Sequence, residues 1–238
     1  MTQGIHPLAA NMINQLNRVD TISNNLANTN TVGFKSDHLA EGTFNRYLDD
    51  AMKDKKEPSK LSELMDTVPK INCNYTSNEV GSLMVTGNKL DFAITDPNKY
   101  FKIQNKSGEV LYTRDGAFKN TDGFLVNHNG NKIVDKDNQP IELKDGFESN
   151  LFLVEIDPKN LKKVGNNDYQ ARDSKKIEVV ENSDQYLTQR SLESSNVDSI
   201  TSMVSLIEAQ RKFEQSQKAI SAIDEVNGKL IDKIGYGI

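Results

Sequence analysis

The chain has 238 residues, of which 36% are hydrophobic, and its formal net charge is −5. A mean hydropathy of −0.62 is low for a compact globule of this length, so part of the chain must stay exposed or bury apolar surface against a partner. Acidic and basic residues are interspersed, which leaves no basic face for a nucleic acid. No apolar run approaches the roughly 18 residues that span a bilayer, so we expect no transmembrane segment.

The N-terminus lacks a basic region followed by an apolar stretch, so we expect no Sec signal peptide. Cys73 is the single cysteine, which excludes an internal disulfide and a cysteine metal site. We expect neither a metal nor any other cofactor.

Apolar residues recur every three or four positions near the N-terminus, which predicts a helix over residues 8–29. Pro7 suits its first turn, and Gly33 lies among the residues that end the pattern. The opposite face is rich in Asn, a poor helix former, which favours amides packed between neighbouring helices. We therefore expect an assembly interface made by Leu8, Met12, Leu16, Val19, Ile22 and Leu26, together with Asn24, Asn25 and Asn28.

Residues 36–79 read as an irregular connector, with a short amphipathic piece at 44–52 and a charged run at 53–60. After this connector the apolar pattern changes to alternation, with short runs at 90–94, 100–103, 110–112, 124–126 and 132–134. Gly-containing turn dipeptides separate these runs and are strong hairpin signals: Ser107-Gly108, Asp115-Gly116, Asp122-Gly123 and Asn129-Gly130. Two further strands, at 151–156 and 176–180, bracket a polar loop. The pattern predicts a small antiparallel β domain over residues 80–185.

The last stretch predicts one long helix over residues 197–234, about 57 Å at 1.5 Å per residue. Ser195 is the expected N-cap, with Asp198 three residues later, and Gly235 suits the C-terminal end. A heptad row follows one face of the helix: Leu206, Ala209, Phe213, Ser216, Ile220, Ile223, Asn227, Leu230 and Ile234. A second apolar row lies on another face: Val197, Ile200, Val204 and Ile207. We expect one row to pair with the N-terminal helix and the other to meet a neighbouring molecule. An ordinary two-helix core in a monomer is the alternative.

These elements predict an α+β fold in which long N- and C-terminal helices pair as a coiled-coil-like layer, with a small antiparallel β domain in the central part of the chain. The expected divisions are 1–35 for the N-terminal helix and the residues after it, 36–79 for the connector, 80–185 for the β domain and 186–238 for the C-terminal helix.

No residue constellation favours catalysis or metal binding. A glycosidase needs two carboxylates in a cleft, but the acids at hand lie in turns or at strand edges: Asp91, Asp115, Asp122 and Glu142. A Ser/His/Asp triad would need one of three histidines that are far apart in the sequence: His6, His38 and His128. Residues 135–138 weakly resemble a calcium loop, but Pro140 and Gly146 occupy positions where the loop needs Gly and Glu.

Four segments resemble the flagellar axial family, the rod and hook proteins of the bacterial flagellum. The N-terminal signature is similar over residues 18–35, which read RVDTISNNLANTNTVGFK, and the entry to the family's β domain is similar over 83–94, LMVTGNKLDFAI. The central block resembles 112–118, YTRDGAF, with GFLV at 123–126 and Gly130. The C-terminal signature resembles LESSNV at 192–197 and IEAQR at 207–211. Two positions depart from the family pattern: residues 96–99 replace a Gly-rich approach, and Arg190 stands where Gly is usual.

The resemblance implies a non-enzymatic axial subunit, most similar to a basal-body rod protein, whose terminal segments fold together during polymerisation. It implies export through the flagellar type III apparatus without a cleaved signal peptide, a periplasmic place in the basal body, and partners that are other copies and other rod proteins. The short chain favours a proximal rod protein. The alternatives are a distal rod or hook subunit, or a monomeric periplasmic binding or peptidoglycan-acting domain.

Overall fold

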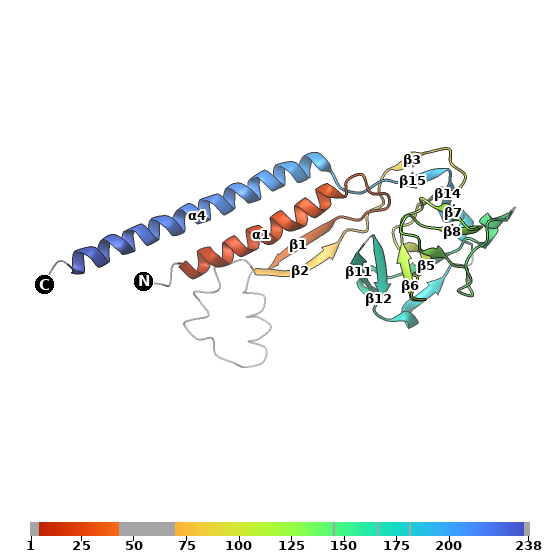
Figure 1. Cartoon of the computed structure of the whole chain (residues 1–238), viewed down its shortest axis with the longest axis horizontal. Coiled ribbons are helices and arrows are strands. Elements are labelled where there is room, and N and C mark those ends of the chain that lie inside the picture. The colour runs from red at the N-terminus through yellow and green to blue at the C-terminus, as the bar shows by residue number, and fades with distance from the viewer. Residues whose placement is uncertain (1–4, 43–69, 145, 166, 181, 236–238) are drawn as a thin grey trace. The chain divides into compact units, whose positions relative to one another are not determined.

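The computed structural model describes residues 5–42, 70–144, 146–165, 167–180 and 182–235 (Figure 1). These residues form two compact units. Unit 1 combines residues from 1–26, 37–76 and 198–238, and unit 2 combines Ala27–Ser36 with Ser77–Val197. The expected piece at 44–52 and the charged run at 53–60 lie outside the described residues.

Unit 1 contains both helices and a pair of strands. Helix α1 covers Ile5–Ala27 and α4 covers Ser199–Gly235, so the N-terminal helix has 23 residues and the C-terminal helix 37. Strands β1 (Asp37–Gly42) and β2 (Lys70–Thr76) pair antiparallel, with Asp37 opposite Thr76. The expectation of an irregular connector over 36–79 is therefore wrong at both ends. A turn dipeptide could not predict this pair, because 27 residues lie between its two strands.

The N-cap expected at Ser195 is also wrong. Asp198 caps α4, since its carboxylate accepts hydrogen bonds from the main-chain N–H of Ile200 at 2.9 Å and of Thr201 at 3.3 Å. The Ser195 hydroxyl instead accepts the N–H of Val197 at 3.3 Å. The helix consequently begins at Ser199, two residues later than expected.

Unit 2 is an antiparallel β domain with short 3₁₀ turns. Its strands are β3 (Leu83–Val85), β4 (Phe92–Ile94), β5 (Lys99–Gln104), β6 (Val110–Thr113), β7 (Lys119–Thr121), β8 (Phe124–Val126), β9 (Lys132–Ile133), β10 (Leu153–Ile156), β11 (Leu161–Gly165), β12 (Asp168–Ala171), β13 (Ile177–Val179), β14 (Leu187–Gln189) and β15 (Ser191–Glu193). The 3₁₀ turns are η2 (Phe147–Asn150), η3 (Pro158–Asn160), η4 (Ser174–Lys176) and η5 (Ser183–Tyr186).

The main sheet of unit 2 runs in the order β11-β12-β6-β5-β9-β8-β7, and β10 pairs with both β5 and β13. Two separate ribbons pair β14 with β4 and β15 with β3. The seven strand regions predicted between residues 90 and 180 are all present, and β10 pairs with β13 as a hairpin that brackets a loop. That loop was expected to be irregular, but it holds the β11–β12 hairpin.

Three of the four predicted turns join paired strands: 107–108 joins β5 to β6, 122–123 joins β7 to β8, and 129–130 joins β8 to β9. The Asp115-Gly116 prediction is wrong, because β6 and β7 do not pair. A Cβ on Gly116 would lie 1.7 Å from the carbonyl oxygen of Phe92, so this glycine permits a close approach of two backbone segments.

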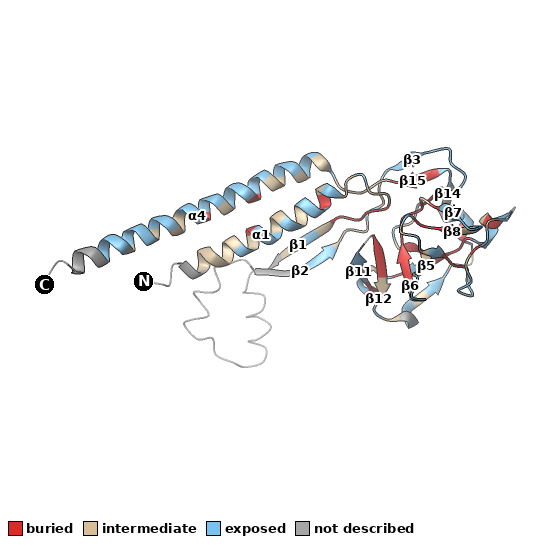
Figure 2. Ribbon diagram, in the orientation of Figure 1, coloured by how far each residue is buried: buried red, intermediate tan, exposed pale blue. Residues whose placement is uncertain are grey.

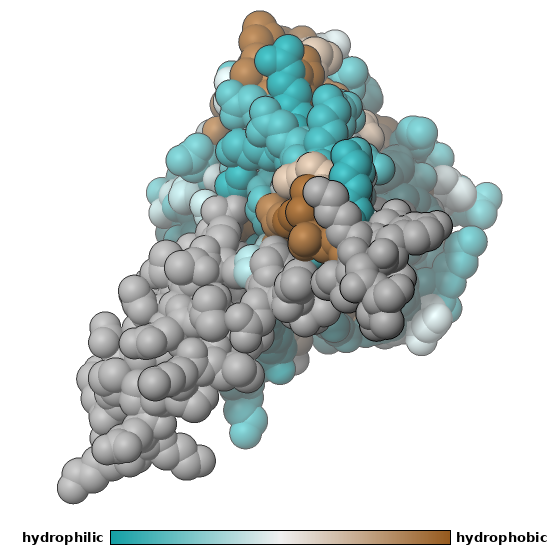
Figure 3. Space-filling model, turned by 90° about the vertical axis from the view of Figure 1, so that its left-hand side faces the viewer, coloured by the Kyte–Doolittle hydropathy of each residue, from teal (hydrophilic) through white to brown (hydrophobic). Residues whose placement is uncertain are grey.

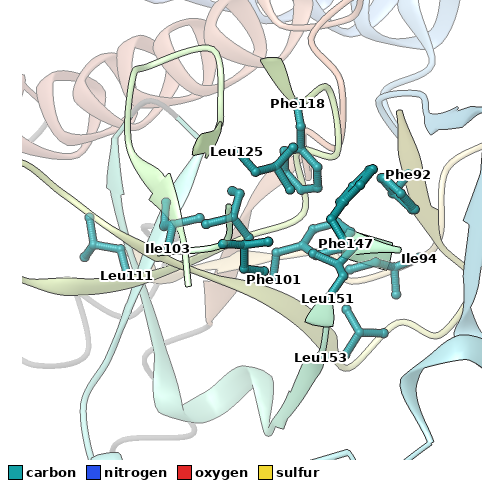
Figure 4. Close-up of a cluster of buried hydrophobic side chains, with 12 residues drawn as sticks. Phe92, Ile94, Phe101, Ile103, Leu111, Phe118, Leu125, Phe147, Leu151 and Leu153 are labelled. Carbon is teal, nitrogen blue, oxygen red and sulfur yellow. The ribbon is translucent and has the colours of Figure 1, made fainter. Parts of the chain in front are cut away.

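Two buried clusters form the core of unit 2. The larger contains the ten residues labelled in Figure 4 together with Ile133 and Ile141, and the Phe92, Phe101, Phe118 and Phe147 rings pack within it at tilted or edge angles. The second lies around Tyr100, Tyr112, Phe152 and Tyr169. Unit 2 thus holds an apolar interior made of two clusters, whereas most of α4 is exposed (Figure 2).

Within the described ranges, no helix combines the length and apolar character needed to cross a membrane.

Candidate functional site

The N-terminal signature ends beside the beginning of the C-terminal signature inside unit 2. The N–H of Gly33 donates to the carbonyl oxygen of Glu193 at 2.7 Å, and the N–H of Asn196 donates to that of Phe34 at 3.3 Å. The side chain of Asn196 also accepts the N–H of Ser36 at 2.8 Å. Residues from the two ends of the chain are therefore parts of one β domain.

A buried carboxylate lies at this meeting point and binds two cations. One oxygen of Glu193 is 2.6 Å from the Lys35 Nζ, and the other is 2.8 Å from both Nε and Nη2 of Arg114. The N–H of Gly81 donates to the first oxygen at 3.0 Å. We call Lys35, Arg114 and Glu193 the Glu193 cluster. Its members come from the N-terminal signature, the central block and the C-terminal signature.

Arg114 is completely buried and all five of its N–H donors have acceptors. Besides Glu193, Nη1 donates to the carbonyl oxygens of Asp96 at 2.7 Å and Lys99 at 2.9 Å, and Nη2 donates to that of Ile94 at 3.1 Å. The carboxylate partner of Arg114 therefore comes from the same chain.

The Glu193 cluster carries two positive charges and one negative charge in a nearly dry interior. Burial, and then the charge of Arg114, lower the pKa of Lys35 to about 8, although Glu193 acts in the opposite direction. Lys35 also donates to the carbonyl oxygen of Glu79 at 2.5 Å. These contacts are what compensate the high desolvation cost of the buried ions.

Two glycines let the backbone segments around the Glu193 cluster pack closely. Gly33 has a φ of +64°, and a Cβ there would lie 2.5 Å from the carbonyl oxygen of Arg114. A Cβ on Gly81 would lie 1.9 Å from the carbonyl oxygen of Ser194. Both contacts exclude any side chain larger than hydrogen.

The two departures from the family pattern also lie in unit 2. Arg190 has a φ of +61°, in the left-handed region that favours glycine, which accounts for the glycine that is usual there. In the 96–99 segment, Asp96 pairs with the Lys99 Nζ at 2.9 Å, so a local ion pair occupies the place of a Gly-rich approach.

In unit 1, the heptad row of α4 is the more buried of its two apolar rows. Ala209 and Ser216 are buried, and Asn11 of α1 donates to the Ser216 hydroxyl at 3.2 Å. Half-buried or intermediate positions on this row are Leu206, Phe213, Ile220 and Ile223, whereas Leu230 is exposed and Ile234 lies outside the described side chains. On α1 the intermediate positions are Leu8, Met12, Val19, Ile22 and Leu26, and Leu16 is exposed.

The second apolar row of α4 is open to solvent. Ile200 is 74% exposed, Val204 53% and Ile207 50%, and Met203 beside them is 51% exposed. Val197, the first residue of the row, belongs to unit 2 and has intermediate exposure. The row is therefore a stripe of four exposed apolar side chains, which we call the α4 stripe: Ile200, Met203, Val204 and Ile207.

The asparagines expected at the interface include Asn25 and Asn28, which make hydrogen bonds inside the chain. The Asn25 amide is buried, donates to the carbonyl oxygen of Asp37 at 2.7 Å and accepts the N–H of the same residue at 2.9 Å. Asn28 accepts the hydroxyl of Thr31 at 3.1 Å, and Asn24 is exposed. Asn25 thus fixes the start of β1 against α1.

The acids and histidines considered for catalysis have structural contacts. Asp91 accepts the Thr86 hydroxyl at 2.6 Å, Glu142 pairs with Lys144, and His38 stacks on Tyr75 with ring centres 5.4 Å apart. Asp122 lies in the β7–β8 turn with a φ of +54°. His128 contacts Asp115, a pair that sequence reasoning missed. His6 lies in α1, and nothing is described of its side chain.

The region that resembled a calcium loop is a turn in which the Asp135 carboxylate accepts the N–H groups of Asp137 and Gln139, each at 2.9 Å. In the described part of the chain, no three His, Cys, Asp or Glu side chains group as a metal site.

Comparison with known proteins identifies the family. Residues 10–35 match the flagella basal body rod protein family, residues 94–164 match the flagellar hook protein FlgE/F/G D1 domain, and residues 188–233 match the flagellar basal body rod FlgEFG protein C-terminal region. The basal-body rod protein FlgG of Borreliella burgdorferi is 31% identical over 264 residues, which cover 96% of this chain and 97% of the relative. The chain belongs to the flagellar basal-body rod protein family.

Two further relatives agree with this family assignment. FlgG of Agrobacterium fabrum is 30% identical over 92% of this rod-family chain and 94% of its own length. The hook-basal body complex protein FlhP of Bacillus subtilis is 27% identical over 93% and 96% of the two chains. The chain is a structural subunit of the flagellar basal-body rod. The first match contains Lys35, the second contains Arg114 and the third contains Glu193. The matched regions together therefore contain the Glu193 cluster.

We expect Glu193→Gln to destabilise unit 2 by about 3–5 kcal/mol, because it leaves two buried cations without a countercharge. Chemical unfolding of the full chain, followed by near-ultraviolet circular dichroism of the tyrosines in unit 2, measures this change. Adding Lys35→Met should recover part of the loss, because one uncompensated cation is then gone.

Glu178→Gln, at an exposed strand position, is the matched control and should change stability by no more than about 0.5 kcal/mol. A Glu193→Gln protein as stable as this control would contradict a structural role for the ion cluster.

Proposed function

We propose that this rod subunit polymerises through its terminal helices, with the α4 stripe buried against a neighbouring subunit. The observation that carries the proposal is the exposure of four large apolar side chains on one face of α4. In Figure 3, brown apolar surface lies open beside hydrophilic surface. Exposed apolar surface of this kind is typical of a protein–protein contact.

The two rows of α4 have different roles in this proposal. The heptad row pairs with α1 of the same chain as a coiled-coil-like layer, which is supported by the buried Ala209 and Ser216 and by the Asn11–Ser216 hydrogen bond. The α4 stripe then remains for the next subunit. Burying it stabilises the polymer by about 1.5–3 kcal/mol for each side chain that becomes fully covered.

We propose that the same helices become ordered during assembly. Fixing one residue costs about 1–2 kcal/mol of backbone entropy, so helices with a single half-covered face are marginal in an isolated monomer. Burial of the α4 stripe offsets that cost only where a neighbouring subunit is present. Assembly thereby depends on an existing template, and we propose no catalytic step.

We further propose that the flagellar type III export apparatus moves the chain out of the cytoplasm without cleaving a signal peptide. The chain then takes its place in the periplasmic part of the basal body. Its partners are other copies of itself and other rod proteins. Among rod positions we propose the proximal rod, because the chain is short and its centre departs from the family pattern at residues 96–99.

We expect Ile207→Asp to leave secretion and monomer stability unchanged and to abolish incorporation into the rod. Ile207 is half exposed in the chain alone, so the monomer should change by no more than about 0.5 kcal/mol, whereas a buried unpaired charge is very costly in the polymer. Immunoblotting of purified basal bodies measures incorporation, and blotting of the secreted fraction measures export.

Gln217→Asp adds the same charge at an exposed polar position of α4 that lies off the α4 stripe, and it should be incorporated normally. Leu206→Asp and Phe213→Asp should also block incorporation, but these half-buried residues can disturb the monomer as well. Normal incorporation of Ile207→Asp would overturn the role of the α4 stripe.

Electron cryotomography of motors in a strain lacking the gene tests the rod position. A rod missing from its base upward is the expected result for a proximal subunit. A rod stub would assign the chain to the distal rod, and a full rod without a hook would assign it to the hook. Normal motors would overturn the proposed position in the rod.

A further inference from the structure

A second buried polar cluster lies next to the Glu193 cluster in unit 2. Asp168, the first residue of β12, lies opposite Thr113 of β6, and Asp115 follows two residues after Thr113. The imidazole Nδ1 of His128, from the β8–β9 turn, contacts the Asp115 carboxylate. We call Asp115, His128 and Asp168 the Asp168 cluster.

Two carboxylates are thus enclosed close together. Asp115 is 1% exposed and Asp168 is 5% exposed, while the His128 side chain is 44% exposed. Asp115 accepts the N–H of Ala117 at 3.0 Å, and Asp168 accepts the side-chain amide of Asn131 at 3.1 Å. The fold therefore surrounds both acids with neutral hydrogen-bond donors, and the basic side chain in contact with Asp115 is that of His128, at the solvent boundary.

This environment disfavours the charged form of Asp168. Burial is the largest effect and raises the pKa of Asp168 to about 6, with His128 acting against it and the charge of Asp115 adding to it. The charged side chains on the neighbouring elements bind other groups. Arg114 binds Glu193, and Lys163 of β11 donates to the carbonyl oxygen of Lys35 at 2.9 Å.

The Asp168 cluster adjoins the place where the N-terminal signature packs onto the β domain. Asn167, the residue before Asp168, donates its side-chain amide to the carbonyl oxygen of Val32 at 2.8 Å. Gly33 packs against the backbone of Arg114 and Asp115, since a Cβ on it would lie 2.5 Å and 2.9 Å from their atoms. A shift in β6 or in the start of β12 would therefore act directly on Val32 and Gly33.

We propose that Asp115, His128 and Asp168 form a pH-sensitive latch that holds the N-terminal segment Ala27–Ser36 tightly in unit 2 at acidic pH and loosens as the pH rises. At low pH a proton on Asp168 removes the repulsion between the two carboxylates.

The direction of the pH dependence follows from the linkage between proton binding and folding. The pKa of Asp168 is higher in the folded chain than its ordinary value of 3.8, so the folded state binds this proton more tightly. The resulting stabilisation is fully present below the ordinary pKa and is lost as the pH rises through about 6. Lys35 titrates near pH 8, so it does not contribute over this range.

The test is amide hydrogen exchange of Gly33 in the full chain, measured by nuclear magnetic resonance between pH 4.5 and 7.5 and corrected for the intrinsic exchange rate. The Gly33 N–H donates to the carbonyl oxygen of Glu193, so its exchange reports release of the N-terminal segment. A pKa shift of one unit corresponds to a factor of ten, so we expect its opening constant to rise roughly ten- to a hundredfold across this range.

Asp168→Asn keeps the shape of the side chain without its titration, and its opening constant should stay low and independent of pH. Asp137→Asn, at an exposed acid, should retain the full rise seen in the original chain. A flat profile in the original chain, or an unchanged rise in Asp168→Asn, would overturn the latch.

If Asp168→Asn does not fold, the carbon-13 titration of the Asp168 carboxyl group in the original chain decides. A midpoint near 6 supports the latch, and a midpoint near the ordinary value of 3.8 overturns it.

Discussion

Unit 2 depends on the ion pairs that the buried Glu193 carboxylate makes. This carboxylate accepts Lys35 from one end of the chain and Arg114 from the β domain, and it belongs itself to the segment before α4. A buried charge without a partner costs several kcal/mol, so the β domain is complete only when residues from both ends of the chain have joined it. The fold therefore couples packing of the two terminal signatures to formation of the β core. In the sequence, α1 ends and α4 begins next to the segments that this packing fixes.

The periodic parts of the fold could be predicted from the sequence, because their signals are local. The three- and four-residue spacing on both helices gave their bounds to within three residues, and the turns containing Gly108, Gly123 and Gly130 connect paired strands. The two rows of α4 were also separable by spacing alone, and the exposure of Ile200 and Ile207 agrees with a face that is not covered within the chain.

The Glu193 cluster could not be predicted, because 158 residues separate Lys35 from Glu193 and no spacing rule connects them. Asp115-Gly116 shows a related limit: the dipeptide has hairpin chemistry, but Gly116 is needed for a backbone contact with Phe92 that is distant in sequence. The β1–β2 pair was missed for the same reason, and Asp198 replaced Ser195 as the helix cap because only the folded backbone decides which carboxylate or hydroxyl faces the free N–H groups.

Hydrogen exchange of the purified full-length monomer, resolved along the chain by mass spectrometry, tests the account most directly. The account predicts that at pH 4.5 the segments around Gly33 and Asn196 exchange as slowly as the core strands β5 and β10, because the Glu193 cluster binds them to the β domain. It predicts that most of α1 and α4 exchange many times faster, because a neighbouring subunit is needed to cover their apolar faces. Helices protected as strongly as β5 and β10 in the monomer would contradict it and would favour a self-sufficient helical core.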